Sequence, residues 1–129
     1  MAVGNPAVNV ANLNPGTTAV SATGNDTATT TFTECVSALV IVTCTAVSAS
    51  GIFVPVLAQT VDGTNYTALT PASGSPMAAV SATGVQVYRF NQVAGKVRTQ
   101  WTKTSGTSIT AVVTIIGLIT KDTANATAV

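Results

Sequence analysis

Residues 38–49 read ALVIVTCTAVSA, and this stretch decides the fold class. In an extended strand, alternate side chains point to opposite faces. One face then carries Leu39, Ile41, Thr43 and Val47, and the other carries Val40, Val42, Cys44 and Ala46. Because both faces are apolar, we expect this strand to be central in its sheet or to pack against a partner.

Other segments are also typical of strands, because Thr, Val and Ile are common and strong helix formers are scarce. We expect further strands over 27–36, 52–60, 77–82, 85–91, 95–103 and 108–119. Asp62-Gly63 and Ser105-Gly106 predict hairpin turns, since these residues tolerate the positive φ of a tight turn. Short strands separated by turns predict an all-β, antiparallel β-sandwich of jelly-roll type.

The chain divides into three parts by composition. Residues 1–18 are expected to form an extended N-terminal arm, because Pro6, Pro15 and several asparagines oppose a regular ladder. Residues 19–120 form the β-sandwich domain, and 121–129 a loose C-terminal tail. The arm is not wholly polar, so we expect it to order against a partner through Val3, Val8, Val10 and Leu13.

A short sequence occurs more than once. AVSATG is found at 19–24 and again at 79–84, and AVSASG is found at 46–51. One interpretation is a common strand end followed by a glycine turn, in a chain of low diversity. The other is two related halves of a double Greek key. The unequal spacings do not fit a solenoid or a propeller.

Charge is unusually sparse in this chain of 129 residues: 7 % of the side chains are charged, the net charge is +1, and there is no histidine. An average soluble domain carries roughly 25 % charged residues. A strongly electrostatic nucleic-acid binder is therefore not expected. No targeting segment or membrane span is expected either, since the most apolar runs are interrupted by threonine and are shorter than a bilayer requires.

The residues for a catalytic or metal site are also missing. Two cysteines without histidine cannot complete a four-ligand zinc site, so no metal and no cofactor is expected. Cys35 and Cys44 are either free thiols or a local disulfide. The sequence does not indicate that the carboxylates of Asp26 and Glu34 lie close enough to act as an acid–base pair. The chain also has no histidine that could serve as the base for a nucleophile. We therefore expect no enzyme.

Most basic residues fall in one short stretch, where aromatic residues are interleaved with them. Tyr88, Phe90 and Trp101 accompany four of the five cations. This pattern is compatible with a basic and aromatic surface for an acidic partner or a glycan. The interpretation that we favour is the solvated face of a sheet above buried aromatics. The candidate contact residues are Arg89, Lys96, Arg98 and Lys103.

Residues 52–119 resemble a pattern found in small structural proteins of bacteriophages. The first part is a strand that runs into DGTNY at 62–66. The second, residues 83–117, contains an aromatic strand, Val93-Ala94-Gly95, Val97-Arg98, Thr104-Ser105-Gly106 and a last strand that ends at Gly117. The resemblance implies a β-sandwich and a place in the virion, and it brings no catalytic residue.

Among virion roles, the low surface charge favours permanent contact with neighbours, since near-zero net charge promotes association. We expect a capsid decoration (cement) protein that binds the major capsid protein. It would be a homo-oligomer, a dimer or trimer, with no nucleic-acid or membrane partner. It would be made in the host bacterial cytoplasm and sit on the capsid surface. The alternative is a glycan-binding or host-adhesion module, or a neck or tail component.

Overall fold

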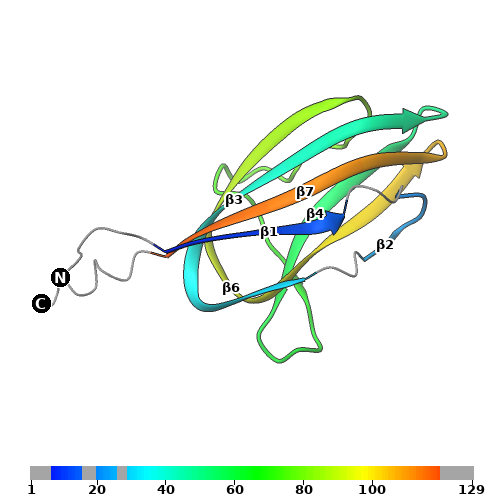
Figure 1. Cartoon of the computed structure of the whole chain (residues 1–129). Coiled ribbons are helices and arrows are strands. Elements are labelled where there is room, and N and C mark those ends of the chain that lie inside the picture. Colours follow the sequence, from blue (N-terminus) through cyan, green and yellow to red (C-terminus); the bar gives the residue numbers. More distant parts are fainter. Residues whose placement is uncertain (1–6, 16–19, 26–28, 120–129) are drawn as a thin grey trace, which may run out of the picture.

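The computed structural model describes residues 7–15, 20–25 and 29–119, with the backbone alone at 7–15, 33–35 and 118–119. The described part is all-β, and its strands form one seven-stranded antiparallel sheet (Figure 1). The strands are β1 (Ala7–Pro15), β2 (Gly24–Asn25), β3 (Thr30–Ser48), β4 (Ile52–Thr60), β5 (Thr67–Ala68), β6 (Gly84–Ser105) and β7 (Ser108–Ile119). Within these residues no helix is long and apolar enough to cross a membrane.

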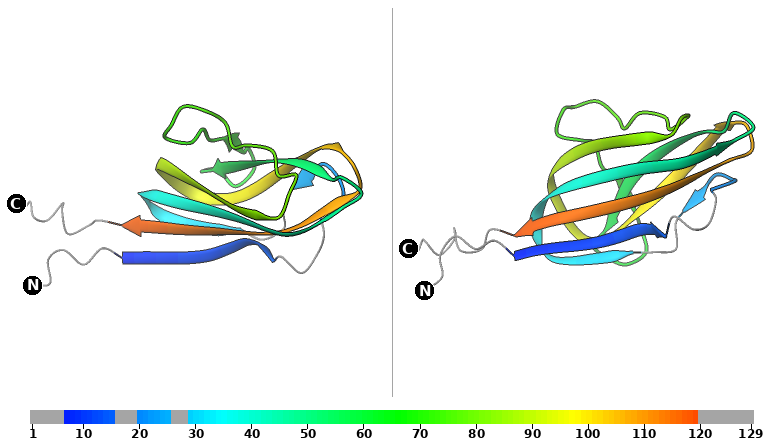
Figure 2. Two further views of the ribbon diagram at one scale, coloured as in Figure 1. Left: turned by 90° about the horizontal axis from the view of Figure 1, so that it is seen from above. Right: turned by 45° about the horizontal axis from the view of Figure 1, so that its top comes forward.

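The strand order is β1-β7-β3-β6-β4-β5, and β2 pairs with β6 beside this path. The central position predicted for 38–49 is confirmed, because β3 lies between β7 and β6. The long strand β6 pairs with β3 along residues 84–97 and with β4 along 96–105. The sheet curves around this shared strand, so its two ends face each other across the core (Figure 2).

Two pairs of predicted strands are each a single strand in the structure. Segments 27–36 and 38–49 fall in one strand, β3, and segments 85–91 and 95–103 fall in one strand, β6. The strand predicted over 52–60 is confirmed, as is that over 108–119. The strand predicted over 77–82 is wrong, since only Val80 in that segment makes a β-bridge, with Phe53.

The two predicted hairpins have different outcomes. Asp62-Gly63 lies in a true hairpin, because β5 pairs antiparallel with β4. Ser105-Gly106 does not, since β6 and β7 are not neighbours in the sheet. Gly106 has φ of 77°, and a Cβ atom there would overlap the backbone of Gly51 in the β3–β4 connection. The glycine signal marks a reversal of the chain, but the strands on either side find other partners.

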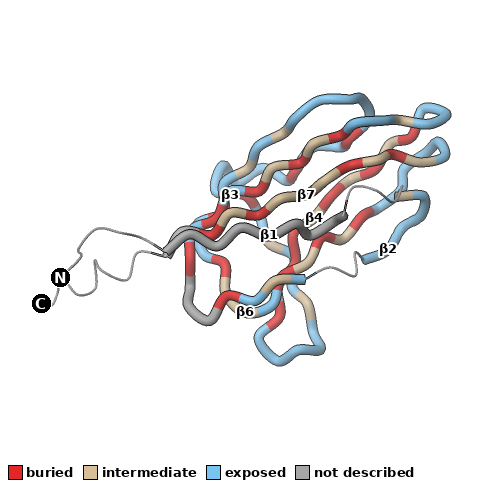
Figure 3. Tube along the Cα trace, in the orientation of Figure 1, coloured by how far each residue is buried: buried red, intermediate tan, exposed pale blue. Residues whose placement is uncertain are grey.

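The core lies on the inner side of the sheet and follows strand alternation. Val40 and Val42 of β3 and Val113 and Ile115 of β7 are almost fully buried (Figure 3). Bulges change which positions face inward: Phe90 is buried and so is Val93, three residues later. The rest of the buried cluster is Phe32, Val36, Ala38, Cys44, Phe53, Leu57, Met77, Val80, Val97, Trp101, Ile109 and Ala111.

One of these bulges corrects the assignment of Val47. The sequence pattern placed Val47 on the same face as Leu39. The register shifts between Cys44 and Ala46, and Val47 then pairs with the buried Ile109 and packs against the core. Cross-strand partners share a face, so the shift moves Val47 to the inner side.

The two AVSATG copies occupy matching places in the fold. Val20 exchanges two backbone hydrogen bonds with Ile109, at 2.7 and 3.1 Å, and Val80 exchanges two with Phe53, also at 2.7 and 3.1 Å. Ile109 is the second residue of β7, and Phe53 is the second residue of β4. After a bend, Gly24 and Gly84 each begin a strand. The AVSASG copy differs, because it forms the end of β3 and the turn after it.

The strand order has the same symmetry. If β1, β3 and β4 are matched with β5, β6 and β7, the order β1-β7-β3-β6-β4-β5 reads the same from either end. Ala7 pairs with Ile119 and Val8 with Leu118, whereas Thr67 pairs with Gln59 and Ala68 with Ala58. Each residue of the second set is 60 positions from its counterpart in the first. The arrangement favours the interpretation of two related halves.

The N-terminal part differs from the expected arm where the structure describes it. Residues 7–15 form β1, an edge strand that pairs with β7. The prediction of an extended arm over 1–18 is therefore not confirmed. Residues 1–6 and 16–18, and the predicted tail over 121–129, lie outside the described residues.

Candidate functional site

The most unusual surface is the solvent side of β3, β7 and the first part of β6, residues 84–90, which we call the outer face. Side chains that alternate with the buried ones point to this side. Leu39, Val85 and Val87 are exposed to 42 %, 63 % and 57 %. The apolar members of the outer face are Leu39, Ile41, Val85, Val87, Val112 and Ile116.

Strand register places these side chains in adjacent rows. Ile41 lies between Val87 of β6 and Thr114 of β7. In the next row, Leu39 lies between Arg89 and Ile116. Directly opposed side chains on one face have Cβ atoms about 4.5–5.5 Å apart. The outer face is therefore a continuous apolar surface and not a set of scattered exposed residues.

A shallow hollow of about 370 Å³ lies at the row that contains Leu39. Among the residues whose side chains the structure describes, Ser37, Ala38, Leu39, Arg89 and Ile116 line it, and Arg89 is the charged one. Such a hollow suits an apolar side chain of a partner, with an acidic or aromatic group beside Arg89.

The opposite side of the molecule is partly covered by the chain itself. On β4 and the second part of β6, residues 96–105, Ala58 faces outward opposite Arg98 and is nevertheless fully buried. The Arg98 Cζ atom lies 3.5 Å from the centroid of the Tyr66 ring, in a cation–π contact. The hairpin that ends in β5 thus covers the part of this surface around Ala58, whereas Leu39, Val85 and Val87 of the outer face are exposed.

The covering hairpin is held in shape by Asp62. Its carboxylate accepts hydrogen bonds from the backbone N–H groups of Thr64 (2.7 Å) and Asn65 (2.8 Å), from Asn65 Nδ2 (2.9 Å) and from Thr60 Oγ1 (2.8 Å). These bonds, first those from the two backbone groups, lower the pKa of Asp62 far below its ordinary value. Asp62 is therefore a structural residue of the turn.

The four predicted basic contact residues do not form one patch. Lys96 and Arg98 share the outward side of the second part of β6, and Arg98 is half-buried beneath Tyr66. Arg89 lies in the first part of β6, opposite Leu39 and beyond the bulge. Lys103 is exposed near the end of β6, where its backbone N–H donates to Thr23 Oγ1 at 3.0 Å.

The aromatic residues are mostly engaged within the fold. Trp101 is 2 % exposed and belongs to the core. Tyr88 is half-buried, and its hydroxyl donates to Gln86 Oε1 at 2.6 Å and accepts from the Ala78 N–H at 2.9 Å. One face of the Tyr66 ring lies against Arg98. A fully exposed aromatic platform of the kind that stacks on sugars is not among these three.

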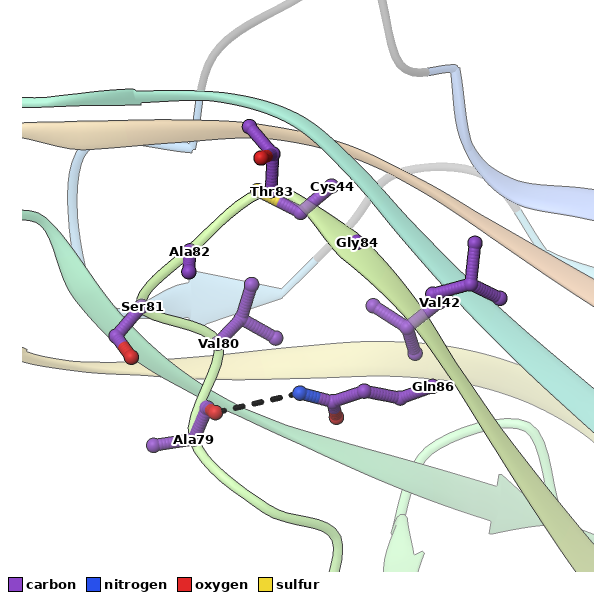
Figure 4. Close-up of a pocket in the computed structure, with 10 residues that line it drawn as sticks. Val42, Cys44, Ala79, Val80, Ser81, Ala82, Thr83, Gly84 and Gln86 are labelled. Carbon is purple, nitrogen blue, oxygen red and sulfur yellow. Dashed lines mark hydrogen bonds between the residues drawn. The ribbon is translucent and has the colours of Figure 1, made fainter.

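A cavity of about 210 Å³ lies between β3 and residues 79–86 (Figure 4). Val42 and Cys44 of β3 line it on one side, with Val80 and Gln86 on the other, and Gln86 Nε2 donates to the Ala79 carbonyl at 3.4 Å. The Cys44 thiol is free and buried, and it contacts the carbonyl of Ala46. None of the described residues that line this cavity is charged, so they offer the thiol no base.

The remaining predicted residues are placed only by their backbone or not at all. Val8, Val10 and Leu13 belong to β1, where Val8 and Val10 pair with Leu118 and Ile116 of β7. Val3 and Asp26 lie outside the described residues, as does the side chain of Glu34. Within the described part, no three histidine, cysteine or carboxylate side chains gather as metal ligands would.

The sequence pattern carried part of the signal for the outer face. Apolar residues on both faces of the strand predicted over 38–49 indicated that it is central or packed against a partner. Leu39 and Ile41 lie on the outer face. Val85 and Val87 were not singled out, although they alternate with the inward side chains of Gln86 and Tyr88.

Comparison with known proteins adds no name to this description. No family model, no curated protein and no solved structure matches the chain.

Proposed function

We propose that this chain is a structural protein of a bacteriophage virion, a capsid decoration (cement) protein that binds the outer shell and bridges subunits of the major capsid protein. The observation that carries the proposal is the open outer face, an apolar sheet surface on which Arg89 is the one charged side chain among the described residues. Large exposed apolar patches mark interaction sites in soluble proteins.

The role would be mechanical. A decoration protein seated across two capsomers adds buried area that must be lost before the capsomers separate. With about 25 cal/mol released per Å² of apolar area buried, even a few hundred Å² per copy matters when many copies bind. The nearly uncharged surface fits such an assembly, because few charges must be desolvated on contact.

The finer fold belongs to the same proposal. We expect an antiparallel β-sandwich of jelly-roll type, with β1 and the residues before it forming the extended arm at its edge. The curved sheet and its single core support two facing layers. A place in the neck or tail would use the same outer face. A glycan-binding or adhesion module has less support, because Trp101 is buried and one face of the Tyr66 ring lies against Arg98.

The test measures binding to expanded empty capsids of the phage that carries the gene. We expect Leu39→Asp combined with Ile116→Asp to abolish binding and the added heat stability of the capsid. Val61→Asp is the control, since Val61 is 86 % exposed in the hairpin away from the outer face. Equal occupancy of all three proteins would contradict the proposal.

Two further measurements separate the related roles. Deletion of residues 1–6 leaves β1 in place, and it should weaken capsid binding if the arm extends onto the shell. The copy number per virion distinguishes the locations, because a shell protein is present in hundreds of copies and a neck or tail ring in few. Binding on a polysaccharide array with no capsid binding would favour the adhesion alternative.

A further inference from the structure

The first part of β6 has one open edge. Its other edge pairs with β3 without interruption from Gly84–Cys44 to Phe90–Ala38. The carbonyl of Arg89 points away from β3, because it accepts a hydrogen bond from the Ala72 N–H at 2.7 Å. Alternate residues of an antiparallel strand direct their backbone groups to the same side. The N–H and C=O groups of Val85 and Val87 therefore also point away from β3.

Those groups form an exposed strand edge at the border of the outer face (top of Figure 1). Among the described residues, no backbone group pairs with Val85 or Val87 on that side. Their side chains are exposed to 63 % and 57 %. Unpaired edges with apolar side chains are templates for another strand, and proteins normally protect them with charges, proline or a covering loop. Residues 84–88 contain no charge and no proline.

The sequence of this edge is self-complementary. Val85-Gln86-Val87 reads the same in both directions, so an antiparallel second copy related by a two-fold axis at Gln86 sets Val85 opposite the partner's Val87. Both residues have outward backbone groups, so each such pair can exchange two N–H···O=C bonds. The Ala72 contact at Arg89 would end the new ladder on each side.

We propose that the Val85–Val87 edge of β6 is a self-association surface, at which a second copy of this chain pairs antiparallel through the same residues. Two-fold dimers with one shared patch are the commonest homo-oligomers. The pairing would join two outer faces into one surface across six strands, three from each copy. The proposal names the contact of a homodimer, and it holds whether or not the chain belongs to a capsid.

A ladder of five residues is short, so the dimer is expected to be weak, with a dissociation constant of about 10 µM to 1 mM. The test combines analytical ultracentrifugation with amide exchange measured by NMR over this range. We expect a monomer–dimer equilibrium and protection of the Val85 and Val87 amides that rises with concentration. A protein that remains monomeric at 1 mM, or protection that rises elsewhere and not at these two amides, would overturn the proposal.

The register gives a sharper test through charge. Val85→Lys with Val87→Lys sets like charges opposite each other in the dimer and should weaken it at least tenfold. Val85→Lys with Val87→Glu sets Lys opposite Glu twice and should retain dimerisation. Val61→Lys is the matched control, and near-native NMR spectra establish that each variant folds. Equal weakening by both double variants would also overturn the proposal.

This outcome is separate from that of the capsid assay. The variant with Leu39→Asp and Ile116→Asp leaves the β6 edge unchanged, so it should still dimerise. Dimerisation without capsid binding by the wild type would contradict the decoration role alone. Capsid binding by a wild type that shows no β6 pairing would contradict the self-association surface alone.

Discussion

The guanidinium of Arg98 lies over the ring of Tyr66, with its Cζ atom 3.5 Å from the ring centroid. This contact fixes the hairpin after β4 onto the outward side of the sheet, above the buried Ala58. Cation–π contacts contribute about 0.5–1 kcal/mol when exposed and about 2 kcal/mol when desolvated. Arg98 is half-buried, which places the contact between these limits.

We therefore expect Tyr66→Ala to lower the free energy of unfolding by about 1–2 kcal/mol. Urea unfolding of the wild type, Tyr66→Ala, Arg98→Met and the double variant forms a double-mutant cycle. Arg98→Met keeps the apolar stem and removes the cation. A coupling energy close to zero would show that the two side chains do not stabilise each other.

Gly95 and Gly63 provide a matched pair of glycine substitutions. Both have positive φ, 74° and 83°. A Cβ atom at Gly95 would overlap the carbonyl oxygen of Thr60, whereas one at Gly63 meets nothing within 4 Å. The left-handed conformation alone costs roughly 1–2 kcal/mol for alanine. Gly63→Ala should cost that amount, and Gly95→Ala clearly more, measured by thermal or urea unfolding. Equal costs would mean that the backbone at Gly95 can move away from Thr60.

Local sequence patterns predicted some strands correctly and divided others. The pattern of apolar and polar residues identified β4 and β7 and the central position of β3. It could do so because successive side chains of a strand alternate between two faces, and this alternation is visible in neighbouring residues. It divided β3 and β6 in two, because bulges near Val36 and between Phe90 and Val93 interrupt the alternation while the strand continues. Local periodicity cannot distinguish a bulge from a loop.

Pairing was the harder problem. The glycine turn at Ser105-Gly106 correctly marked a reversal, but pairing of β6 with β4 and of β7 with β3 depends on the whole core. The four basic residues are close in sequence and divided in space for the same reason, since the first part of β6 pairs with β3 and the second part with β4. The sequence pattern predicted only part of the outer face, because Ile41 and Val87 are paired across strands that are far apart in the sequence.

Thr99 and Thr60 test the cost of a buried hydroxyl. Both are buried, at 1 % and 3 % exposure. Thr60 Oγ1 donates to Asp62 and accepts from the Gly63 N–H, whereas Thr99 Oγ1 has no hydrogen-bond partner among the described residues.

Removing a buried hydroxyl that has no hydrogen-bond partner recovers the free energy that its desolvation costs. We expect Thr99→Val to raise the free energy of unfolding by about 1 kcal/mol and Thr60→Val to lower it by at least as much. A destabilised Thr99→Val would indicate an ordered water on that hydroxyl.

The Asp62 turn predicts a dependence of stability on pH. Four hydrogen bonds to the carboxylate lower its pKa in the folded protein below the ordinary value of 3.8. A group with a depressed folded pKa stabilises the protein above its unfolded pKa, and this contribution is lost as pH falls below it. The wild type should therefore lose stability from about pH 4 downward.

The variant Asp62→Ala removes the titrating group. It should be less stable than the wild type at pH 7, and the difference should narrow between pH 4 and pH 2, as measured by urea unfolding at each pH. A difference that stays constant over this range would mean that the carboxylate charge contributes nothing to the turn.

Val20 and Val80 test the two related halves by a matched pair of truncations. Each valine lies in a copy of AVSATG and exchanges two backbone hydrogen bonds with the second residue of a strand. Alanine retains those backbone bonds, so Val→Ala isolates the side-chain contribution. Val80 is 2 % exposed within the core, whereas Val20 is partly buried against it. We expect Val80→Ala to lower the free energy of unfolding by about 2 kcal/mol and Val20→Ala to lower it by about half as much, with no change in fold.

Amide exchange provides a second test of the two bridges. The Phe53 amide should exchange faster in Val80→Ala than in the wild type, and the Ile109 amide should exchange faster in Val20→Ala. If Val20→Ala instead left the Ile109 amide as protected as in the wild type, the two bridges would not be equivalent, and the similarity of the halves would extend only to their backbone.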